Sequence, residues 1–273
     1  MTNNIHSSAV IEQSVQLGKN ITIGPFCYVS GNVNIDDNTI LKSHVVISGN
    51  TKIGKNNIFF PFANIGDLPQ DLKFSGESSS LEIGNNNIFR ENVTIHTGTE
   101  LGNKYHNIYN VTKIGDNCLF MVGSHIAHDC VVGNKVILAN NATLAGHVSV
   151  GNNVVMGGLS AALQFVRIGD YAIIGGMSGI ESDVLPYALV MGERAYIAGI
   201  NLIGLKRNNF SKPKIASIKA AYDVLFAENS LNFKEKVKQL KEQANLSAEI
   251  NLLTDFIEGA ATKAILKPKK TPK

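Results

Sequence analysis

The chain has 273 residues, of which 44% are hydrophobic and 17% charged, and its formal net charge is only +3. This composition is typical of a folded globular protein and gives no indication of nucleic-acid binding. No apolar run reaches the roughly 18 residues of a membrane span, and the N-terminus lacks a basic-then-apolar signal. The three cysteines have no CxxC spacing, which favours a reducing compartment. We therefore expect a cytoplasmic protein without membrane insertion.

The first two thirds of the chain repeat with a period of six. Every sixth residue from Ile114 to Ile180 is apolar, and the same step runs from Ile5 to Ile65. This period fits neither a helix nor a single strand, but it is typical of hexapeptide repeats that wind a parallel β-helix. We expect three short strands per coil of about 18 residues, with many of the 25 glycines turning the corners.

Two polar segments interrupt the repeat, at residues 67–80 and 97–112. Because the six-residue step resumes after each one, both are predicted to be loops that leave a regular solenoid. Loops carried by a rigid scaffold are where binding residues concentrate.

The six-residue step fades after Pro186. Ser211-Lys212-Pro213 has the pattern of a helix start, and further apolar stripes predict helices from Phe233 to Leu240 and from Ser247 to Ile257. We predict a parallel β-helix domain over residues 1–190 and a C-terminal helical domain over residues 191–273. The helices are expected to cap the open end of the coil, as solenoids require.

One column of outward positions has the residues of an acid–base site. His128, Gly146 and Gln164 occupy the same position in successive coils, with Asp129 and His147 in the next column. Strands of adjacent coils lie about 4.8 Å apart. The glycine leaves space beside the imidazole and exposes its own N–H. A histidine with a carboxylate beside it and a free N–H above it is the minimum for a general base with an oxyanion donor.

Two glycines mark a second outward strip. Gly158 and Gly176 also lie one coil apart, and we place them at a mid-strand position, where a surface without side chains could receive a long apolar chain. The alternative is that each glycine only turns a corner.

The histidines raise the question of a metal. His125 and His128 are three residues apart, and together with His96 and His147 they could bind an ion between subunits. No cysteine or carboxylate clearly completes such a site, so we expect no metal. A surface histidine is the simpler interpretation of each one alone, although four of them gather beside a loop.

Longer strings point to a family. His125-Ile126-Ala127-His128-Asp129-Cys130 and the string LANNATLAGHV at residues 138–148 closely resemble the acyl-ACP:UDP-N-acetylglucosamine O-acyltransferases that begin lipid A synthesis. The resemblance covers nearly the whole chain, since it includes Gln70-Asp71-Leu72-Lys73, Thr94-Ile95-His96, Gln164-Phe165 and Gly204-Leu205-Lys206-Arg207.

This resemblance implies a homotrimer of left-handed β-helices with sites between neighbouring subunits. His128 would take the proton of the sugar 3-hydroxyl, which attacks the thioester of an acyl chain held on acyl carrier protein. Asp129 would orient His128, and the Gly146 N–H would stabilise the oxyanion. The transfer is direct, so the resemblance implies no cofactor and no metal.

The resemblance also assigns the surrounding residues. The groove for UDP-N-acetylglucosamine would be lined by Gln70, Asp71, Lys73, His96, His125, His147, Gln164, Asn201 and Arg207, and the acyl-chain groove by Gly158 and Gly176. Basic residues at 206, 207, 212 and 214 would meet the acidic carrier protein. The chain departs from the family pattern at Leu163, Asn208 and Glu193, none of which touches the proposed base.

Three other functions compete with this interpretation. A sister N-acyltransferase usually carries an extra N-terminal domain, whereas repeats begin here at Ile5. A pure interaction or ice-binding solenoid would show outward threonine ladders, and it leaves the histidines unexplained. A hexapeptide metalloenzyme of the carbonic anhydrase type would bind metal. Within the favoured family, the acceptor could be the 3-hydroxyl sugar or its 3-amino analogue, and the acyl length is open.

Overall fold

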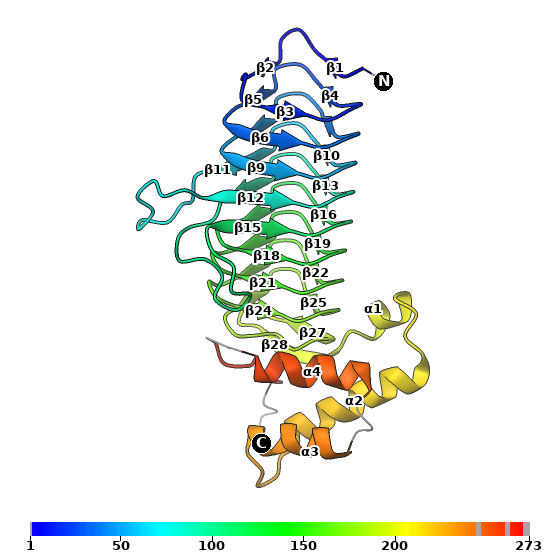
Figure 1. Ribbon diagram of the computed structural model, residues 1–273. Helices are drawn as coiled ribbons and strands as arrows, with labels where there is room; N and C mark the ends of the chain where they lie inside the picture. Colours follow the sequence, from blue (N-terminus) through cyan, green and yellow to red (C-terminus); the bar gives the residue numbers. More distant parts are fainter. Residues whose placement is uncertain (1, 244–246, 260–262, 270–273) are drawn as a thin grey trace.

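The computed structural model describes residues 2–243, 247–259 and 263–269. These residues form a long solenoid of short strands, and helices pack at its C-terminal end (Figure 1). Strands one coil apart pair in parallel and in register, as Asn4 does with Thr22 and Ile137 with Val155. The predicted mainly β solenoid followed by a helical region is therefore confirmed.

Three sheets form the walls of the solenoid. The first contains β1 (Asn4–Ile5), β4 (Thr22–Ile23), β7 (Ile40–Leu41), β10 (Ile58–Phe59), β13 (Ile88–Phe89), β16 (Leu119–Phe120), β19 (Ile137–Leu138), β22 (Val155–Met156), β25 (Ile173–Ile174), β27 (Ala188–Met191) and β28 (Tyr196–Ile200). The second contains β2 (Val10–Ile11), β5 (Tyr28–Val29), β8 (Val46–Ile47), β11 (Asn64–Asp67), β14 (Thr94–His96), β17 (His125–Ile126), β20 (Thr143–Leu144), β23 (Ala161–Ala162) and β26 (Gly179–Ile180). The third contains β3 (Gln16–Leu17), β6 (Asn32–Ile35), β9 (Asn50–Ile53), β12 (Ser80–Ile83), β15 (Val111–Ile114), β18 (Val131–Val132), β21 (Ser149–Val150) and β24 (Arg167–Ile168).

The interior of the coil is the hydrophobic core. Every residue of the six-residue series from Ile114 to Ile180 is buried, as the period predicted. Aromatic side chains stack along the axis, with 4.5 Å between the ring centroids of Phe59 and Phe89 and 5.0 Å between those of Phe89 and Phe120. Burial of these rings together with the many aliphatic side chains of the core stabilises a fold whose strands are only a few residues long.

The corners are turned in a way that the sequence analysis did not expect. Residues with positive φ recur every six positions, and most are not glycine; Asp129 has φ 59°, Asn141 58° and His147 63°. Asparagine and aspartate tolerate this left-handed conformation better than other non-glycine residues. Many corners are closed by a backbone hydrogen bond to the previous coil, such as His147 N–H to the His128 carbonyl at 3.0 Å. Many glycines do lie in the corners, as predicted, but the residue that adopts positive φ is usually not glycine.

Both interruptions of the repeat are loops, as predicted. The segment between β11 and β12 projects sideways from the solenoid, and the segment between β14 and β15 runs along its outer surface toward the C-terminal coils (Figure 1). The isolated bridge between Asn103 and Ile108 holds a turn in the second loop.

The helices are α1 (Leu202–Arg207), α2 (Lys212–Phe226), α3 (Phe233–Gln243) and α4 (Ala248–Glu258). The three predicted helices correspond to α2, α3 and α4, with Ser211 and Ser247 as N-caps; α1 and the β27–β28 hairpin were not predicted. The helices cover the last coil, since Tyr222 Oη donates to the Pro186 carbonyl at 2.6 Å. The boundary at residue 190 stays a prediction, and residues 270–273 lie outside the described part. No helix in the described ranges is long and apolar enough to cross a membrane.

Candidate active site

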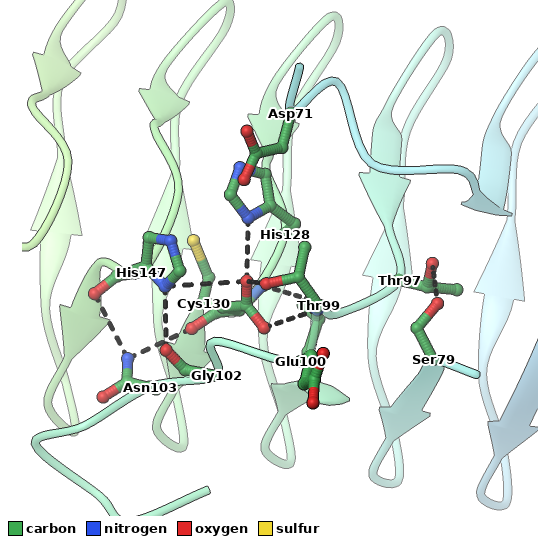
Figure 2. Close-up of polar contacts among 12 residues, drawn as sticks. Asp71, Ser79, Thr97, Thr99, Glu100, Gly102, Asn103, His128, Cys130 and His147 are labelled. Atoms are coloured by element: carbon green, nitrogen blue, oxygen red, sulfur yellow. Dashed lines mark hydrogen bonds and ion pairs between the residues drawn. The ribbon is translucent and has the colours of Figure 1, made fainter. Parts of the chain in front are cut away.

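His128 and Asp129 form a buried hydrogen-bonded pair at the corner between β17 and β18. His128 Nδ1 lies 2.8 Å from Asp129 Oδ2, and the two side chains are 5% and 0% exposed. The Asp129 backbone N–H donates to Thr112 Oγ1 at 2.8 Å, which helps to hold the corner. The sequence placed both side chains outside the coil, and they are outside it, but the second loop covers them (Figure 2).

The hydrogen bonds around Asp129 assign the tautomer of His128. The carboxylate accepts from the Thr99 N–H at 2.7 Å through Oδ1 and from Thr99 Oγ1 at 2.6 Å through Oδ2. An ionised carboxylate only accepts, so the His128 nitrogen that faces it, Nδ1, carries the proton. In the neutral ring Nε2 then keeps its lone pair, and no hydrogen bond among the described residues occupies it. Nε2 is therefore the atom available to take a proton from a substrate.

Gly146 lies one coil above His128 and against its ring. A Cβ at this position would lie 2.5 Å from His128 Cε1 and 2.6 Å from Nε2, so only glycine fits beside this imidazole. The Gly146 carbonyl accepts from the Phe165 N–H at 3.1 Å, whereas the Gly146 N–H donates to no other group within the described ranges. The glycine next to the imidazole is the arrangement that the sequence predicted, and the role of its N–H as an oxyanion donor stays a prediction.

His147 is the second histidine on the same carboxylate. Its Nδ1 lies 2.8 Å from the Gly102 carbonyl and 3.5 Å from Asp129 Oδ2, and a carbonyl only accepts, so Nδ1 again carries the proton. The ring meets His128 edge-on, with 4.9 Å between centroids, and stacks on Phe165 at 4.4 Å. Burial lowers the pKa of His147, which the Gly102 hydrogen bond and the charge of Asp129 partly offset.

His96 and His125 complete a run of four histidines along the second sheet and its corner. Their rings meet edge-on with 4.9 Å between centroids, and His125 Nδ1 lies 2.7 Å from Thr94 Oγ1. Burial, followed by the neighbouring charges of His96 and His128, lowers the pKa of His125 to about 4. Burial also lowers the pKa of His96, against the charge of Asp67. His96 Nδ1 is buried and has no hydrogen-bond partner among the described residues.

The first loop contributes Asp71. Burial lowers the pKa of His147, and the charge of Asp71 opposes that shift slightly. Figure 2 draws the Asp71 carboxylate on the same side of the coil as His128. Asp71 Oδ1 accepts from the Lys73 N–H at 3.0 Å, which fixes the turn of the loop. Gln70 and Lys73 are exposed, as is Gln164 in the coil above Gly146.

Comparisons with known proteins identify the family of this chain. Residues 112–146 match the model of bacterial transferase hexapeptide repeats, and residues 183–266 match domain 2 of UDP-N-acetylglucosamine O-acyltransferase. The acyl-(acyl-carrier-protein)–UDP-N-acetylglucosamine O-acyltransferase of Thermodesulfovibrio yellowstonii is 48% identical over 256 residues, which are 94% of this chain and 96% of that protein. The chain belongs to this acyltransferase family.

Solved structures of the family have the same fold. LpxA from Acinetobacter baumannii is 41% identical with a TM-score of 0.91, covering 96% of this chain and 99% of that one. UDP-N-acetylglucosamine O-acyltransferase (LpxA) from Moraxella catarrhalis is 40% identical, also with a TM-score of 0.91, covering 98% of this chain and 100% of that one. The resemblance read from the sequence is thereby confirmed, and the chain is an acyltransferase.

Four of the residues assigned from the sequence lie away from the histidines within one chain. Asn201 caps α1 by accepting from the Gly204 N–H at 2.9 Å, and its Nδ2 donates to the Tyr171 carbonyl at 2.8 Å, so both ends of its side chain are used. Arg207 is exposed in the last turn of α1. Gly158 and Gly176 lie in turns of a different corner and not at the mid-strand position we expected. A Cβ on either would approach only backbone atoms, at 3.3 Å or 3.2 Å.

His128, Asp129 and His147 are also close enough to hold a metal ion, since one ligand atom from each lies within 4.8 Å of the others. The atoms that face one another are two Nδ1 atoms and a carboxylate oxygen. Both Nδ1 atoms donate hydrogen bonds, to Asp129 and to Gly102, so an ion between them would have to displace two protons. This donor set fits an acid–base pair better than a metal centre.

Sequence reasoning missed three residues of the second loop. Thr99 holds the Asp129 carboxylate and Gly102 accepts from His147. Asn103 Nδ2 donates to the Asp129 carbonyl at 3.1 Å, the His147 carbonyl at 3.2 Å and Ser149 Oγ at 3.1 Å. From the sequence, all three belonged only to the polar break at residues 97–112, without a role of their own.

Proposed function

We propose that this acyltransferase moves a (3-hydroxy)acyl chain from acyl carrier protein to the 3-hydroxyl of UDP-N-acetylglucosamine, the first step of lipid A biosynthesis. The relatives are named as O-acyltransferases of UDP-N-acetylglucosamine, and one name gives acyl carrier protein as the acyl donor. The observation that supports it most directly is the buried His128–Asp129 pair, which leaves His128 Nε2 beside the unblocked N–H of Gly146.

In the proposed mechanism His128 Nε2 takes the proton of the sugar hydroxyl while its oxygen attacks the thioester carbonyl carbon. Asp129 stabilises the imidazolium that forms, and the Gly146 N–H donates to the developing oxyanion. When the intermediate collapses, the C–S bond breaks and His128 returns the proton to the leaving thiolate. The C–O bond formed is the new ester, so the cycle needs no cofactor and no metal.

We further propose that the chain is a left-handed coil that assembles as a homotrimer. The outward positions of the first sheet form an apolar stripe along eight strands, consisting of Ile40, Ile58, Ile88, Leu119, Ile137, Val155, Ile173 and Leu189. A contiguous apolar surface of this kind marks an interface. Contact between copies through it would bring Gly158, Gly176, Asn201 and Arg207 of one chain toward the histidines of another. Ile137→Glu should shift the mass measured by light scattering from trimer to monomer.

Acyl carrier protein would dock near α1, where Lys206 and Arg207 form the last turn. Lys214, expected in the same basic surface, is paired with Glu249, so it contributes less free charge. Such surface charges act mainly on the rate of association. We place the reaction in the cytoplasm, which suits three free and buried cysteines.

The test is acyl transfer from 3-hydroxyacyl-carrier proteins of several lengths to UDP-N-acetylglucosamine, with wild type beside His128→Ala and with and without a chelator. We expect the variant to lose at least about 10²–10⁴ in rate, the usual contribution of a general base, and the chelator to change nothing. Transfer only to the 3-amino analogue would show that the acceptor is wrong. Full activity in His128→Ala would refute the mechanism.

A further inference from the structure

Thr99 makes more contacts with the Asp129 carboxylate than any other residue in the described ranges. Its N–H donates to Oδ1 at 2.7 Å and its hydroxyl to Oδ2 at 2.6 Å, the same oxygen that accepts from His128 Nδ1. Thr99 is 3% exposed and Asp129 0%. A carboxylate removed from water to this extent depends on these donors for the stability of its charge.

Thr99 and His128 share the negative charge of Asp129, because the Thr99 hydroxyl and His128 Nδ1 both donate to Asp129 Oδ2. The hydroxyl therefore limits how strongly Asp129 attracts the proton on the imidazole. We propose, on the basis of the function given above, that Thr99 is a positioning residue. Its hydroxyl orients Asp129 Oδ2 toward His128 and sets the pH above which His128 becomes a competent base.

The loop that carries Thr99 is fixed at several points, so the hydroxyl cannot easily be replaced by another donor. Asn103 ties the loop to the backbone of both corner residues, Asp129 and His147. Farther along, the Tyr105 ring lies 4.7 Å from the Arg167 guanidinium. Loss of the hydroxyl therefore leaves Oδ2 with His128 as its main partner.

Other charged groups also face this pair. They are His147, whose Nδ1 is 3.5 Å from Oδ2, His96 and His125 on the second sheet, and Asp71 on the first loop. All four are unchanged when Thr99 is replaced. A difference between two variants at position 99 therefore reports on the hydroxyl itself.

The chain offers a matched control in the same loop. Thr97 is also buried, at 2% exposure, but its hydroxyl lies 2.9 Å from Ser79 Oγ and 3.4 Å from the Asp67 carbonyl and does not contact Asp129 (Figure 2). Thr97→Val removes a buried hydroxyl from the loop without changing the donors of the carboxylate. Thr99→Ser keeps the hydroxyl and removes only a methyl group.

The experiment is kcat/KM for acyl transfer from about pH 5.5 to 9 in wild type, Thr99→Val, Thr99→Ser and Thr97→Val. In Thr99→Val the charge of Asp129 acts more strongly on His128, so the acidic limb should move up by about 0.5–1 pH unit. The loss of rate is then greater near pH 6 than near pH 8. Thr99→Ser and Thr97→Val should keep the wild-type limb.

A uniform loss in Thr99→Val, with the acidic limb unmoved, would reduce Thr99 to a structural role and overturn the proposal. An NMR titration of labelled His128 in wild type and Thr99→Val needs no substrate. A raised midpoint there supports the positioning role even if the assay shows that the acceptor sugar is wrong, and an unchanged midpoint overturns it.

Discussion

Replacing Gly146 with alanine tests whether the site depends on the contact between two coils. The added Cβ would lie 2.5 Å from His128 Cε1 and 2.6 Å from Nε2. Non-bonded carbon atoms prefer about 3.5–4.0 Å, so the imidazole must move by about 1 Å. The ring resists, because its Nδ1 is bonded at 2.8 Å to the buried Asp129. Gly146 is not among the residues with positive φ, so alanine brings no backbone strain.

Moving a positioned catalytic group by 1 Å costs about 10² in rate. We therefore expect kcat/KM of Gly146→Ala to fall by about 10²–10³, toward the loss expected when a general base is removed. Gly158→Ala is the control for thermal stability, since its Cβ meets only the Asn140 carbonyl, at 3.3 Å. Both variants should unfold within a few degrees of wild type. A Gly146→Ala enzyme that keeps more than about a tenth of the wild-type kcat/KM would refute the reasoning.

Three further changes test other parts of the structure. Arg167→Met removes one partner of a buried ion pair with Asp183 (2.7 Å), which should cost about 3–5 kcal/mol in denaturant unfolding at neutral pH. Burial already raises the pKa of Asp183, so the deficit should shrink as that carboxyl gains a proton at acidic pH; a constant deficit would contradict this. The pKa of His125 falls to about 4 through burial, whereas the unfolded chain binds this proton near pH 6.5. Stability is therefore lost as pH falls through this window, and His125→Asn should lose less; equal acid sensitivity would argue against it. Gly176→Met, whose Cβ meets only the Gly158 carbonyl at 3.2 Å, should shorten the preferred acyl chain, and an unchanged preference would remove Gly176 from the groove.

The coil was predictable because its burial pattern is local. An inward side chain recurs every six residues whatever the distant chain does, so Ile114 to Ile180 could be placed from the period alone. The column of His128 and Gly146 followed from the same arithmetic, since hydrogen-bonded strands fix the vertical neighbours. The residues of the outward apolar stripe are vertical neighbours in the same way. Each of them directly precedes a buried core residue in its strand, so only the alternation of the strand separates the stripe from the core.

The contacts of the second loop could not be predicted because no period governs them. Thr99 reaches Asp129 across 30 residues, and Asn103 reaches His147 and Ser149 across 44 and 46. Which residue of an irregular loop meets which corner depends on the path of the loop, and turn-forming residues reveal only that the chain bends. The sequence analysis placed Gly158 and Gly176 at mid-strand for a different reason. Most residues with positive φ at the corners are asparagine or other non-glycine residues, so the presence of a glycine did not indicate a corner.

A regular solenoid can place a histidine outside its coil but cannot remove it from water. His128 and His147 have outward phase and are nevertheless only 4% and 6% exposed, because an interruption of the repeat folds over them. That cover makes the Asp129 charge strong enough to act on an imidazole, since electrostatic interactions weaken in water. Gln164, one coil above Gly146, has the same phase without the cover and is exposed. The His128–Asp129 pair is thus complete within one chain, whereas Gln164 above it is exposed. In the proposed homotrimer, a second chain would supply the other wall of the substrate groove.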